Sequence, residues 1–257
     1  MDYNFEAFMH ILLTNDDGIF APGLAAMYDQ LVAMGDVTVV APAEVRSGAS
    51  HSISLVPVTC EKVDIAGKFQ GYCVDGSPVD CVKFAVKKLF EDRPIDLVIS
   101  GINHGANVGV HLYYSGTVAA AMEGAFNGIP AVALSAMHNG ETGDMDRAAK
   151  CSFEIIQKLL PLDEACVFNV NIPLLDEGDA KGVKVVAHSM NGFYEEYVSS
   201  KDESGQVTYL YTSGKPNDDR DTTMDTTALM DGFITVTPLR LNMNDTAQRE
   251  HLDKIQW

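Results

Sequence analysis

Short apolar runs alternate with helical periods along the first two thirds of the chain. The run 11–14 is apolar or β-branched, and apolar residues then recur every three or four positions over 24–34. The second spacing marks one face of an amphipathic helix, whereas a short apolar run bounded by turn residues is typical of a buried strand. A further apolar run at 37–40 follows a glycine. This order predicts a β–α–β unit.

The same alternation continues to about residue 172. Further buried strands are predicted at 95–100, 129–135 and 166–172, and helices after Ser77, around 117–124 and around 149–160. The segments 51–59 and 69–74 each fit a strand or part of a hairpin. Strands that alternate with helices are typical of a mostly parallel sheet flanked by helices. The pattern therefore predicts an α/β core, over about 9–175.

After Pro173 the pattern becomes richer in strands. Two strand-like segments, 193–197 and 207–212, flank the charged turn 201–205 and predict a long β-hairpin. Strands are also expected at 183–187 and 233–238, and a helix after Asn244. We expect a β-rich extension and C-terminal tail over about 176–257, within a single domain that spans 1–257.

Composition narrows the class of protein. Hydrophobic residues make up 46% and charged residues 21%, as in an ordinary globular chain. No apolar run approaches the roughly 20 residues that span a bilayer. The first ten residues lack a basic segment followed by an apolar run, which predicts a cytoplasmic protein without a secretory signal. The five cysteines form no CxxC pair, so we expect reduced thiols and no structural zinc site.

The charge balance limits the partners. Acidic residues outnumber basic ones 36 to 18, and the net charge is −18. A nucleic-acid polymer normally requires a basic stripe, and the sequence contains none. An anionic small molecule would need local positive charge, which a metal ion and helix N-termini can supply.

Two adjacent carboxylates end the first predicted strand. Asp16 and Asp17 precede Gly18, which permits a sharp turn, so both acids can reach one hard cation. Open α/β sheets bind ligands at the carboxyl ends of their strands. The alternative is that one acid caps a helix and the other is a solvated surface group. The DDG triplet alone favours neither.

Oxygen-bearing side chains follow two other strands at the same edge. Ser47 follows the second strand, and Asn103 and Asn107 follow the strand 95–100 in the glycine-rich segment 101–115. With the two acids they form an all-oxygen set, which suits Mg²⁺, Mn²⁺ or Ca²⁺ and disfavours zinc. Taken singly, Ser47 fits helix capping or a turn, and the asparagines fit left-handed turns.

Ser115, Gly116 and Thr117 open the small-residue helix. Free N–H groups and hydroxyls at such a start can hold phosphate, although the sequence alone favours ordinary N-capping by Ser115 or Thr117. The GxxxxGK[ST] lysine is missing, and no GxGxxG follows the first strand, so neither a P-loop nor a dinucleotide site is predicted. His104 adjoins Asn103 and is a candidate for substrate contact or proton donation.

Four ordered blocks of sequence resemble the SurE (survival protein E) family. The four blocks are Asn15-Asp-Asp-Gly18 with Ala21-Pro-Gly23, Arg46-Ser-Gly-Ala-Ser50, Ser100-Gly-Ile-Asn-His-Gly-Ala-Asn-Val-Gly109 and Tyr114-Ser-Gly-Thr-Val-Ala-Ala-Ala-Met-Glu-Gly124. The segments 169–173 and 225–238 resemble it more weakly, so the likeness covers nearly the whole chain. It implies a Rossmann-like core with a β-hairpin extension, and a C-terminal segment used in homodimers or homotetramers.

The resemblance also implies an activity. Members of the family are metal-dependent phosphatases that hydrolyse nucleoside 5′- and 3′-monophosphates, and some act on short polyphosphate. By that likeness one divalent cation per subunit, Mg²⁺ or Mn²⁺, is held by four ligands, and other residues contact the phosphate. The implied cation ligands are Asp16, Asp17, Ser47 and Asn103; the phosphate or substrate contacts are Asn15, His104, Asn107, Ser115, Gly116 and Thr117.

The expected reaction is in-line attack of water on a phosphomonoester, with Asp16 and Asp17 as the catalytic pair. One of the two carboxylates is expected to take the water's proton. A rival interpretation makes Asp16 a nucleophile that forms a phospho-aspartate, but Asn-Asp-Asp-Gly does not fit the DxDx[TV] strand end of such enzymes. A second rival is a receiver-like signalling module, which the long segment 101–115 and the extra β region disfavour.

Overall fold

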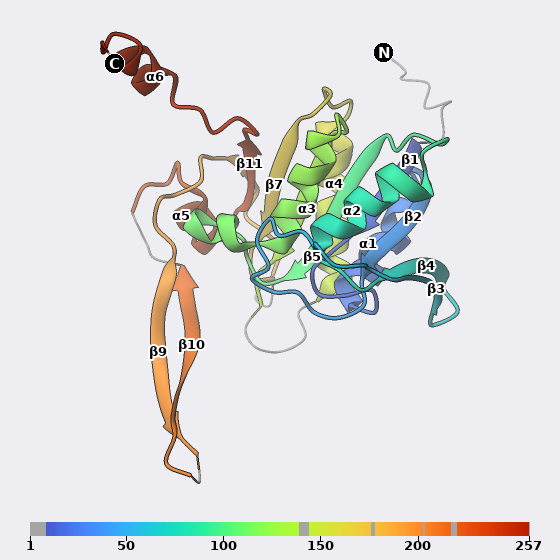
Figure 1. Ribbon diagram of the computed structural model, residues 1–257, viewed down its shortest axis with the longest axis horizontal. Helices are drawn as coiled ribbons and strands as arrows, with labels where there is room; N and C mark the ends of the chain where they lie inside the picture. The colour runs from blue at the N-terminus through green and yellow to red at the C-terminus, as the bar shows by residue number, and fades with distance from the viewer. Residues whose placement is uncertain (1–8, 139–143, 176–177, 203, 217–219, 257) are drawn as a thin grey trace.

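The chain forms a nine-stranded mixed sheet and a separate two-stranded hairpin (Figure 1). The computed structural model describes residues 9–138, 144–175, 178–202, 204–216 and 220–256. The order of the large sheet is β3-β4-β2-β1-β5-β6-β7-β11-β8. Its strands are β1 (Met9–Thr14), β2 (Gly35–Pro42), β3 (Cys60–Ile65), β4 (Phe69–Val74), β5 (Leu97–His104), β6 (Ala131–Ala136), β7 (Val167–Ile172), β8 (Val183–Val185) and β11 (Ile234–Leu239).

Most neighbouring strands are parallel, as the alternating pattern predicted. Only β3–β4 and β7–β11 are antiparallel within the large sheet. The Rossmann-like α/β prediction is thus confirmed, and the hairpin β9 (Phe193–Lys201) and β10 (Val207–Pro216) is present. Strands β8 and β11 lie beyond residue 175 in sequence and still pair within the large sheet.

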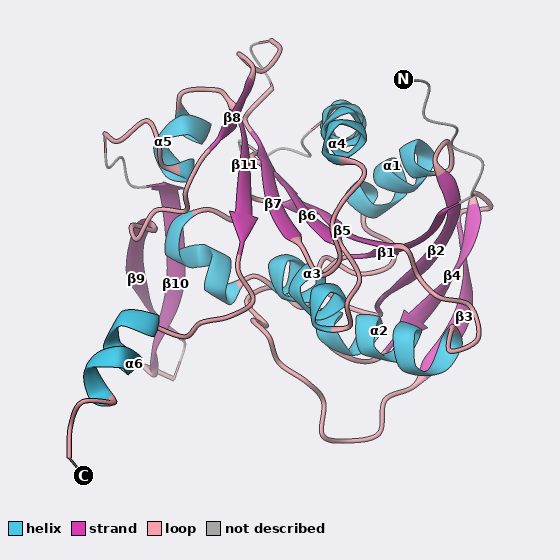
Figure 2. Ribbon diagram, turned by 90° about the horizontal axis from the view of Figure 1, so that it is seen from above, coloured by secondary structure: helices cyan, strands magenta, loops and turns pink. Residues whose placement is uncertain are grey.

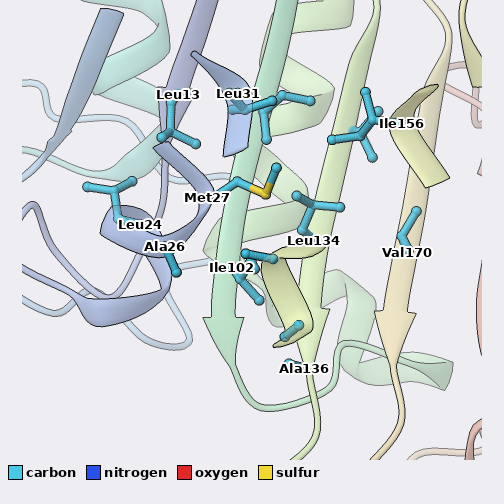
Figure 3. Packing of buried hydrophobic residues seen from close by; sticks show 14 of the residues in the cluster. Leu13, Leu24, Ala26, Met27, Leu31, Ile102, Leu134, Ala136, Ile156 and Val170 are labelled. Atoms are coloured by element: carbon cyan, nitrogen blue, oxygen red, sulfur yellow. The ribbon is translucent and has the colours of Figure 1, made fainter. Parts of the chain in front are cut away.

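Helices cover both faces of the sheet (Figure 2). Helices α1 (Pro22–Leu31) and α4 (Met145–Leu159) pack on one face, and α2 (Pro78–Phe84) and α3 (Gly116–Phe126) pack on the other. Two buried clusters fill the layers between. Figure 3 shows the first, in which Met27 of α1 and Ile156 of α4 lie over Leu134 of β6. Burial of these side chains at about 1.5–3 kcal/mol each fixes the strand ends that form the site.

Local sequence signals explain where these helices begin. Pro22 occupies the first turn of α1, and Pro78 does so in α2. In α2 the Ser77 hydroxyl accepts from Asp80 N, and Asp80 Oδ2 accepts from Ser77 N, which is a capping box. No helix of the described residues is long and apolar enough to cross a membrane.

The structure corrects four local predictions. Segment 51–59 is irregular, because its polar groups bond to side chains rather than to a strand. Residues 101–104 extend β5, with a register shift against β6 after Ser100. The predicted helix after Ser77 ends in a π-helical turn, Ala85–Leu89. The sequence did not predict the short helix α5 (Asp225–Met230); α6 (Thr246–Leu252), by contrast, is the tail helix expected after Asn244.

Candidate functional site

The candidate site lies where the chain reverses its direction across the sheet. From β1 the chain passes to β2 on one side, and β5 pairs with the other side of β1. The carboxyl ends of the strands at such a switch point bound the crevice in which α/β sheets bind ligands. Asp16 and Asp17 follow β1, Ser47 follows β2, and Asn103 is the second-last residue of β5. The fold therefore brings the three predicted segments to one edge.

Asp16, which follows β1, is a buried carboxylate that packs against the start of α3. The residue is only 4% exposed, and its Oδ1 accepts a 2.5 Å hydrogen bond from the Thr117 hydroxyl. Burial raises the pKa of Asp16 to about 6, and the negative charge of Asp17 adds to this rise, while hydrogen bonds from Thr117 partly oppose it. The group is therefore a carboxylate that lacks positive charge beside it.

Asp17 and Asn103 are tied to the end of β5. Asp17 Oδ2 accepts from the backbone N–H of His104 at 2.9 Å. The Asn103 amide nitrogen donates to Gly105 O at 2.8 Å, so its amide oxygen is the atom left to bind a cation. The His104 ring is exposed and stacks on His138 with 3.6 Å between ring centroids.

The loop that carries Ser47 is attached to the backbone of Asp16. Arg46 N donates to Asp16 O at 2.7 Å, which places Ser47 one residue from that contact. Ser47 is exposed and lines the same cavity as Asp16. Ser47 is not the N-cap residue of any α-helix in the described part of the chain, so it does not cap a helix as the alternative prediction required.

The donor set fits a hard divalent cation. Within the described residues no group of three or more His, Cys, Asp and Glu side chains is placed to hold a metal, and the candidate ligands here also include hydroxyl and amide oxygens. Two carboxylates, the Ser47 hydroxyl and the Asn103 amide supply such oxygens. A dication beside Asp16 would also reverse the rise in its pKa, because it favours the charged form.

The N-terminus of α3 packs directly on Asp16. The Ser115 hydroxyl accepts from Val118 N and caps the helix. Gly116 lies so close that an added Cβ would stand 2.9 Å from Asp16 Cβ. Thr117 is fully buried and gives its hydroxyl to Asp16. Thr117 is therefore placed to orient the carboxylate, while the capped start of α3 lies beside it.

Asn107 is held by an asparagine clamp, which we define as Asn169 and Asn171 of β7. Asn107 N donates to Asn171 Oδ1 at 2.8 Å, and Asn107 O accepts from both clamp amides, at 2.8 Å from Asn169 and 3.2 Å from Asn171. The Asn107 side chain donates to Ser135 Oγ at 2.8 Å. The clamp fixes the backbone of the segment between β5 and α3.

We expect Asn171→Ala to release this segment. Loss of two bonds to the Asn107 backbone leaves a buried N–H without its acceptor, which costs about 1–3 kcal/mol of unfolding free energy. Activity at the candidate site should fall roughly tenfold, in line with a misplacement worth about 1.4 kcal/mol. Urea unfolding and steady-state kinetics measure the two effects. Ser152→Ala is the control: the Ser152 hydroxyl of α4 is buried with no hydrogen-bond partner among the described residues, so its loss should leave activity unchanged and should not lower stability.

A strap, defined as residues 46–54, connects the Ser47 loop to helices α2 and α3. His51 Nε2 lies 3.2 Å from Glu123 Oε2 in α3. Ser54 donates through both its backbone N–H and its hydroxyl to the Asp80 carboxylate in α2, at 3.0 Å and 2.6 Å. These bonds attach the Ser47 loop to helices α2 and α3, which the core holds in place.

Glu123 is the buried charge under this strap, in a residue only 3% exposed. Burial pushes its pKa upward, but hydrogen bonds from His51, Lys83 and Asn127 outweigh burial and hold the pKa below its ordinary value. A lowered carboxylate pKa contributes stability above the unfolded-state pKa, and that contribution is lost as the pH falls through the folded-state value.

Glu123→Gln is therefore expected to destabilise the fold at pH 7 by about 1–3 kcal/mol. The difference from the parent should shrink below about pH 4.5, where the unfolded carboxylate also takes up a proton. Urea midpoints at several pH values test this. Asp36→Asn, which breaks the exposed ion pair with Arg93, is the control and should cost under about 1 kcal/mol. A pH-independent difference for Glu123→Gln would contradict the assignment.

A cavity of about 1570 Å³ opens over these groups. Most of the predicted residues line it: Asp16, Ser47, Asn103, His104, Asn107 and Ser115. The others do not reach its surface. Asn15 is fully buried and donates to Gly18 O, which shapes the turn, and Gly116 and Thr117 lie beneath Asp16. Asp17 lies beside the cavity on the backbone of His104.

Sequence reasoning missed the residues that support the site segments without lining the predicted ligand set. Asn169 and Asn171 have the two-residue spacing that places both on one face of a strand, and polar residues in so apolar a run were the available signal. His51 and His111 had no partner visible in the sequence, and the structure pairs them with Glu123 and Glu195. A pairing over that many residues leaves no trace in local spacing.

The family model, the sequence relatives and the solved structure that match this chain all carry the same family name. The family model described as "Survival protein SurE" matches residues 11–195. A protein named 5′-nucleotidase SurE from Rhodopirellula baltica is 42% identical over 238 residues, which are 91% of this chain and 94% of that one. Its namesake from Lawsonia intracellularis is 41% identical over 252 residues, 96% and 98% of the two chains. The crystal structure of the SurE protein from Aquifex aeolicus superposes with a TM-score of 0.81 at 34% identity and covers 95% of this chain and all of its own.

Proposed function

The chain belongs to the SurE family, and from that premise we propose that it is a divalent-cation-dependent phosphomonoesterase for nucleoside 5′- and 3′-monophosphates. The products are a nucleoside and inorganic phosphate, and short polyphosphate is a further proposed substrate. The relatives named 5′-nucleotidase, at 36–42% identity over most of the chain, support nucleotide hydrolysis. One observation carries the proposal: the buried Asp16 carboxylate, raised in pKa, lies against the N-terminus of α3.

We assign the cation to Asp16, Asp17, Ser47 and Asn103. When bound, a Mg²⁺ or Mn²⁺ ion supplies Lewis-acid polarisation of the phosphoryl oxygens and neutralises their charge. The proposed phosphate contacts are Asn107, Ser115 and the first N–H groups of α3, with His104 as a further substrate contact. A helix N-terminus favours the negative charge that develops on the equatorial oxygens.

The chain's own residues then have distinct tasks in the proposed reaction. Thr117 holds Asp16 through Oδ1, and the backbone of His104 holds Asp17 through Oδ2. Each carboxylate keeps one oxygen outside these bonds, and one such oxygen accepts the proton of the attacking water. The water oxygen forms the new bond to phosphorus as the ester P–O bond breaks in line. The leaving alkoxide takes up a proton from solvent water, and the carboxylate returns its proton to solvent.

Phosphate release from nucleoside 5′- and 3′-monophosphates tests the proposal. We expect release in Mg²⁺ or Mn²⁺, loss of at least a hundredfold with EDTA, and recovery when the cation is added back. Activity untouched by EDTA would overturn the cation assignment. Absence of release from any monophosphate would overturn the activity, and a trapped acyl phosphate on Asp16 would favour the phospho-aspartate route instead.

We further propose a cytoplasmic homodimer or homotetramer. The hairpin β9–β10 exposes large apolar and aromatic side chains on a strand pair that projects from the core (Figure 1), among them Tyr194, Val198, Val207 and Leu210. Exposed groups of this size commonly mark an interface. Sedimentation equilibrium at micromolar concentration should give a mass of two or four chains; a single-chain mass would refute this assembly.

A further inference from the structure

One wall of the cavity is aromatic, and no role has yet been assigned to it. His111 and Tyr114 belong to the 3₁₀ helix Gly109–Tyr114, which directly precedes Ser115. Phe193, Tyr197 and Tyr211 come from the base of the hairpin and line the same cavity. Segments far apart in sequence thus meet to present ring faces beside the candidate phosphate contacts.

The rings of this wall support one another at their edges. His111 lies edge-on to Phe193, with 4.5 Å between ring centroids, and Tyr197 lies edge-on to Tyr211 at 5.7 Å. Tyr114 is 57% exposed and Tyr197 is 70% exposed. In each such pair the edge of one ring covers one face of the other, so the free ring surface is that of the exposed tyrosines, Tyr114 and Tyr197, and a planar ligand can stack on it.

A carboxylate lies among these rings. Glu195 Oε1 accepts a 2.8 Å hydrogen bond from the Tyr211 hydroxyl, and His111 Nε2 lies 3.1 Å from the same oxygen. Burial and the nearby Glu195 raise the pKa of Tyr211 to about 12, so the phenol keeps its proton and Glu195 remains the acceptor. Both contacts use Oε1 of Glu195. Its Oε2 can therefore accept a hydrogen bond from an N–H or O–H group of a ligand.

The position of the wall matches the size of a nucleotide. Tyr114 adjoins Ser115, and the 3₁₀ helix that carries the two nearest rings spans only about 12 Å. A base joined to a phosphate at Ser115 therefore falls within reach of these rings.

We propose that this wall, with Glu195 as its hydrogen-bond acceptor, is the subsite for the nucleoside part of the substrate. The flat base stacks on the tyrosine faces, and N–H donors of the base bond to Glu195. The inference rests on the proposed nucleotidase function and adds what selects nucleotides over other phosphomonoesters. Stacking on an aromatic side chain contributes about 1–3 kcal/mol per base, which is roughly five- to a hundredfold in KM.

Paired substrates test the subsite. For AMP and for ribose 5-phosphate, which lacks a base, kcat/KM is measured on the parent and on Tyr197→Ala and Glu195→Gln. We expect each variant to raise the KM for AMP at least fivefold and to leave ribose 5-phosphate unchanged within twofold. Tyr209→Ala is the matched control, because Tyr209 is an exposed tyrosine of the same hairpin that does not line the cavity. It should change neither substrate.

Binding of adenosine, measured by titration calorimetry in EDTA, separates the two proposals. If no phosphate is released from either substrate, the proposed function fails, and weaker adenosine binding by Tyr197→Ala still supports the subsite. If AMP and ribose 5-phosphate are hydrolysed equally well by the parent, the subsite is wrong. It is also wrong if Tyr197→Ala impairs both substrates alike, or if Tyr209→Ala has the same effect as Tyr197→Ala.

Discussion

Asp16→Asn should lower kcat/KM for a nucleoside monophosphate by roughly a thousandfold or more, which is a loss of about 4 kcal/mol. The amide keeps the shape of the carboxylate, and its oxygen still accepts the Thr117 hydroxyl. What disappears is the negative charge of a proposed cation ligand. Steady-state kinetics in saturating Mn²⁺ measures the loss.

The stability of the same variant, measured without a cation, should not fall with its activity but should stay equal or rise. Because burial raises the pKa of Asp16 from 3.8 to about 6, the ionised group costs the cation-free fold about 3 kcal/mol at pH 7. Asp16→Asn removes that cost, so its melting temperature in EDTA should equal or exceed that of the parent. The raised pKa puts the gain above pH 6, and it should vanish below about pH 4.

A surface acid provides the matched control. Asp29→Asn breaks the exposed pair with Lys68 and should change neither activity nor melting temperature appreciably. Cation binding adds a third measurement, since Mn²⁺ should raise the melting temperature of the parent but not of Asp16→Asn. A parallel fall in activity and in melting temperature would make Asp16 a structural residue.

Gly116→Ala should have the next largest effect, roughly a hundredfold loss of activity. The new methyl group would lie 2.9 Å from Asp16 Cβ and 3.0 Å from its Oδ2, so the start of α3 or the carboxylate must move. Either movement separates the cation ligand from the phosphate contacts. The measurements are kcat/KM and the Mn²⁺ concentration that restores half of the activity after EDTA.

Gly124→Ala is the control for this prediction. It makes the same change in the same helix, and its methyl group would meet Val98 Cγ2 at 2.7 Å, away from Asp16. Both variants should lose stability through overpacking, by about 1–3 kcal/mol, but only Gly116→Ala should require more Mn²⁺. Equal kinetic losses in the two variants would show that the effect of Gly116→Ala is general instability.

The features that could be predicted from sequence are those with a local cause. The apolar runs and helical periods located most strands and the four large helices, because each reflects the burial of a single element. Asp16, Ser47 and Asn103 could be assigned to one edge because strands of a parallel sheet end together. In the structure these three side chains line one cavity, as their common position at the strand ends predicts.

The remaining features depend on contacts between distant segments. Nothing near Asn171 in the sequence indicates that its amide holds the backbone of Asn107, and nothing near Thr117 indicates its bond to Asp16. Helical position likewise hid the fact that Gly116 is buried beneath a carboxylate. The aromatic wall escaped notice for the same reason, since hairpin tyrosines at alternating positions also fit an ordinary exposed strand pair.

Asp225 connects the last part of the chain to the candidate site. Fully buried, it accepts from Gly109 N, Ser189 N and Thr226 N, and burial raises its pKa although these bonds oppose the rise. Its bond to Gly109 closes a separation of 116 residues. During synthesis, a ribosome must therefore release nearly the whole chain before the segment that leads to Ser115 acquires its anchor. A nascent chain that stops short of Asp225 contains every proposed cation ligand and still lacks the finished site.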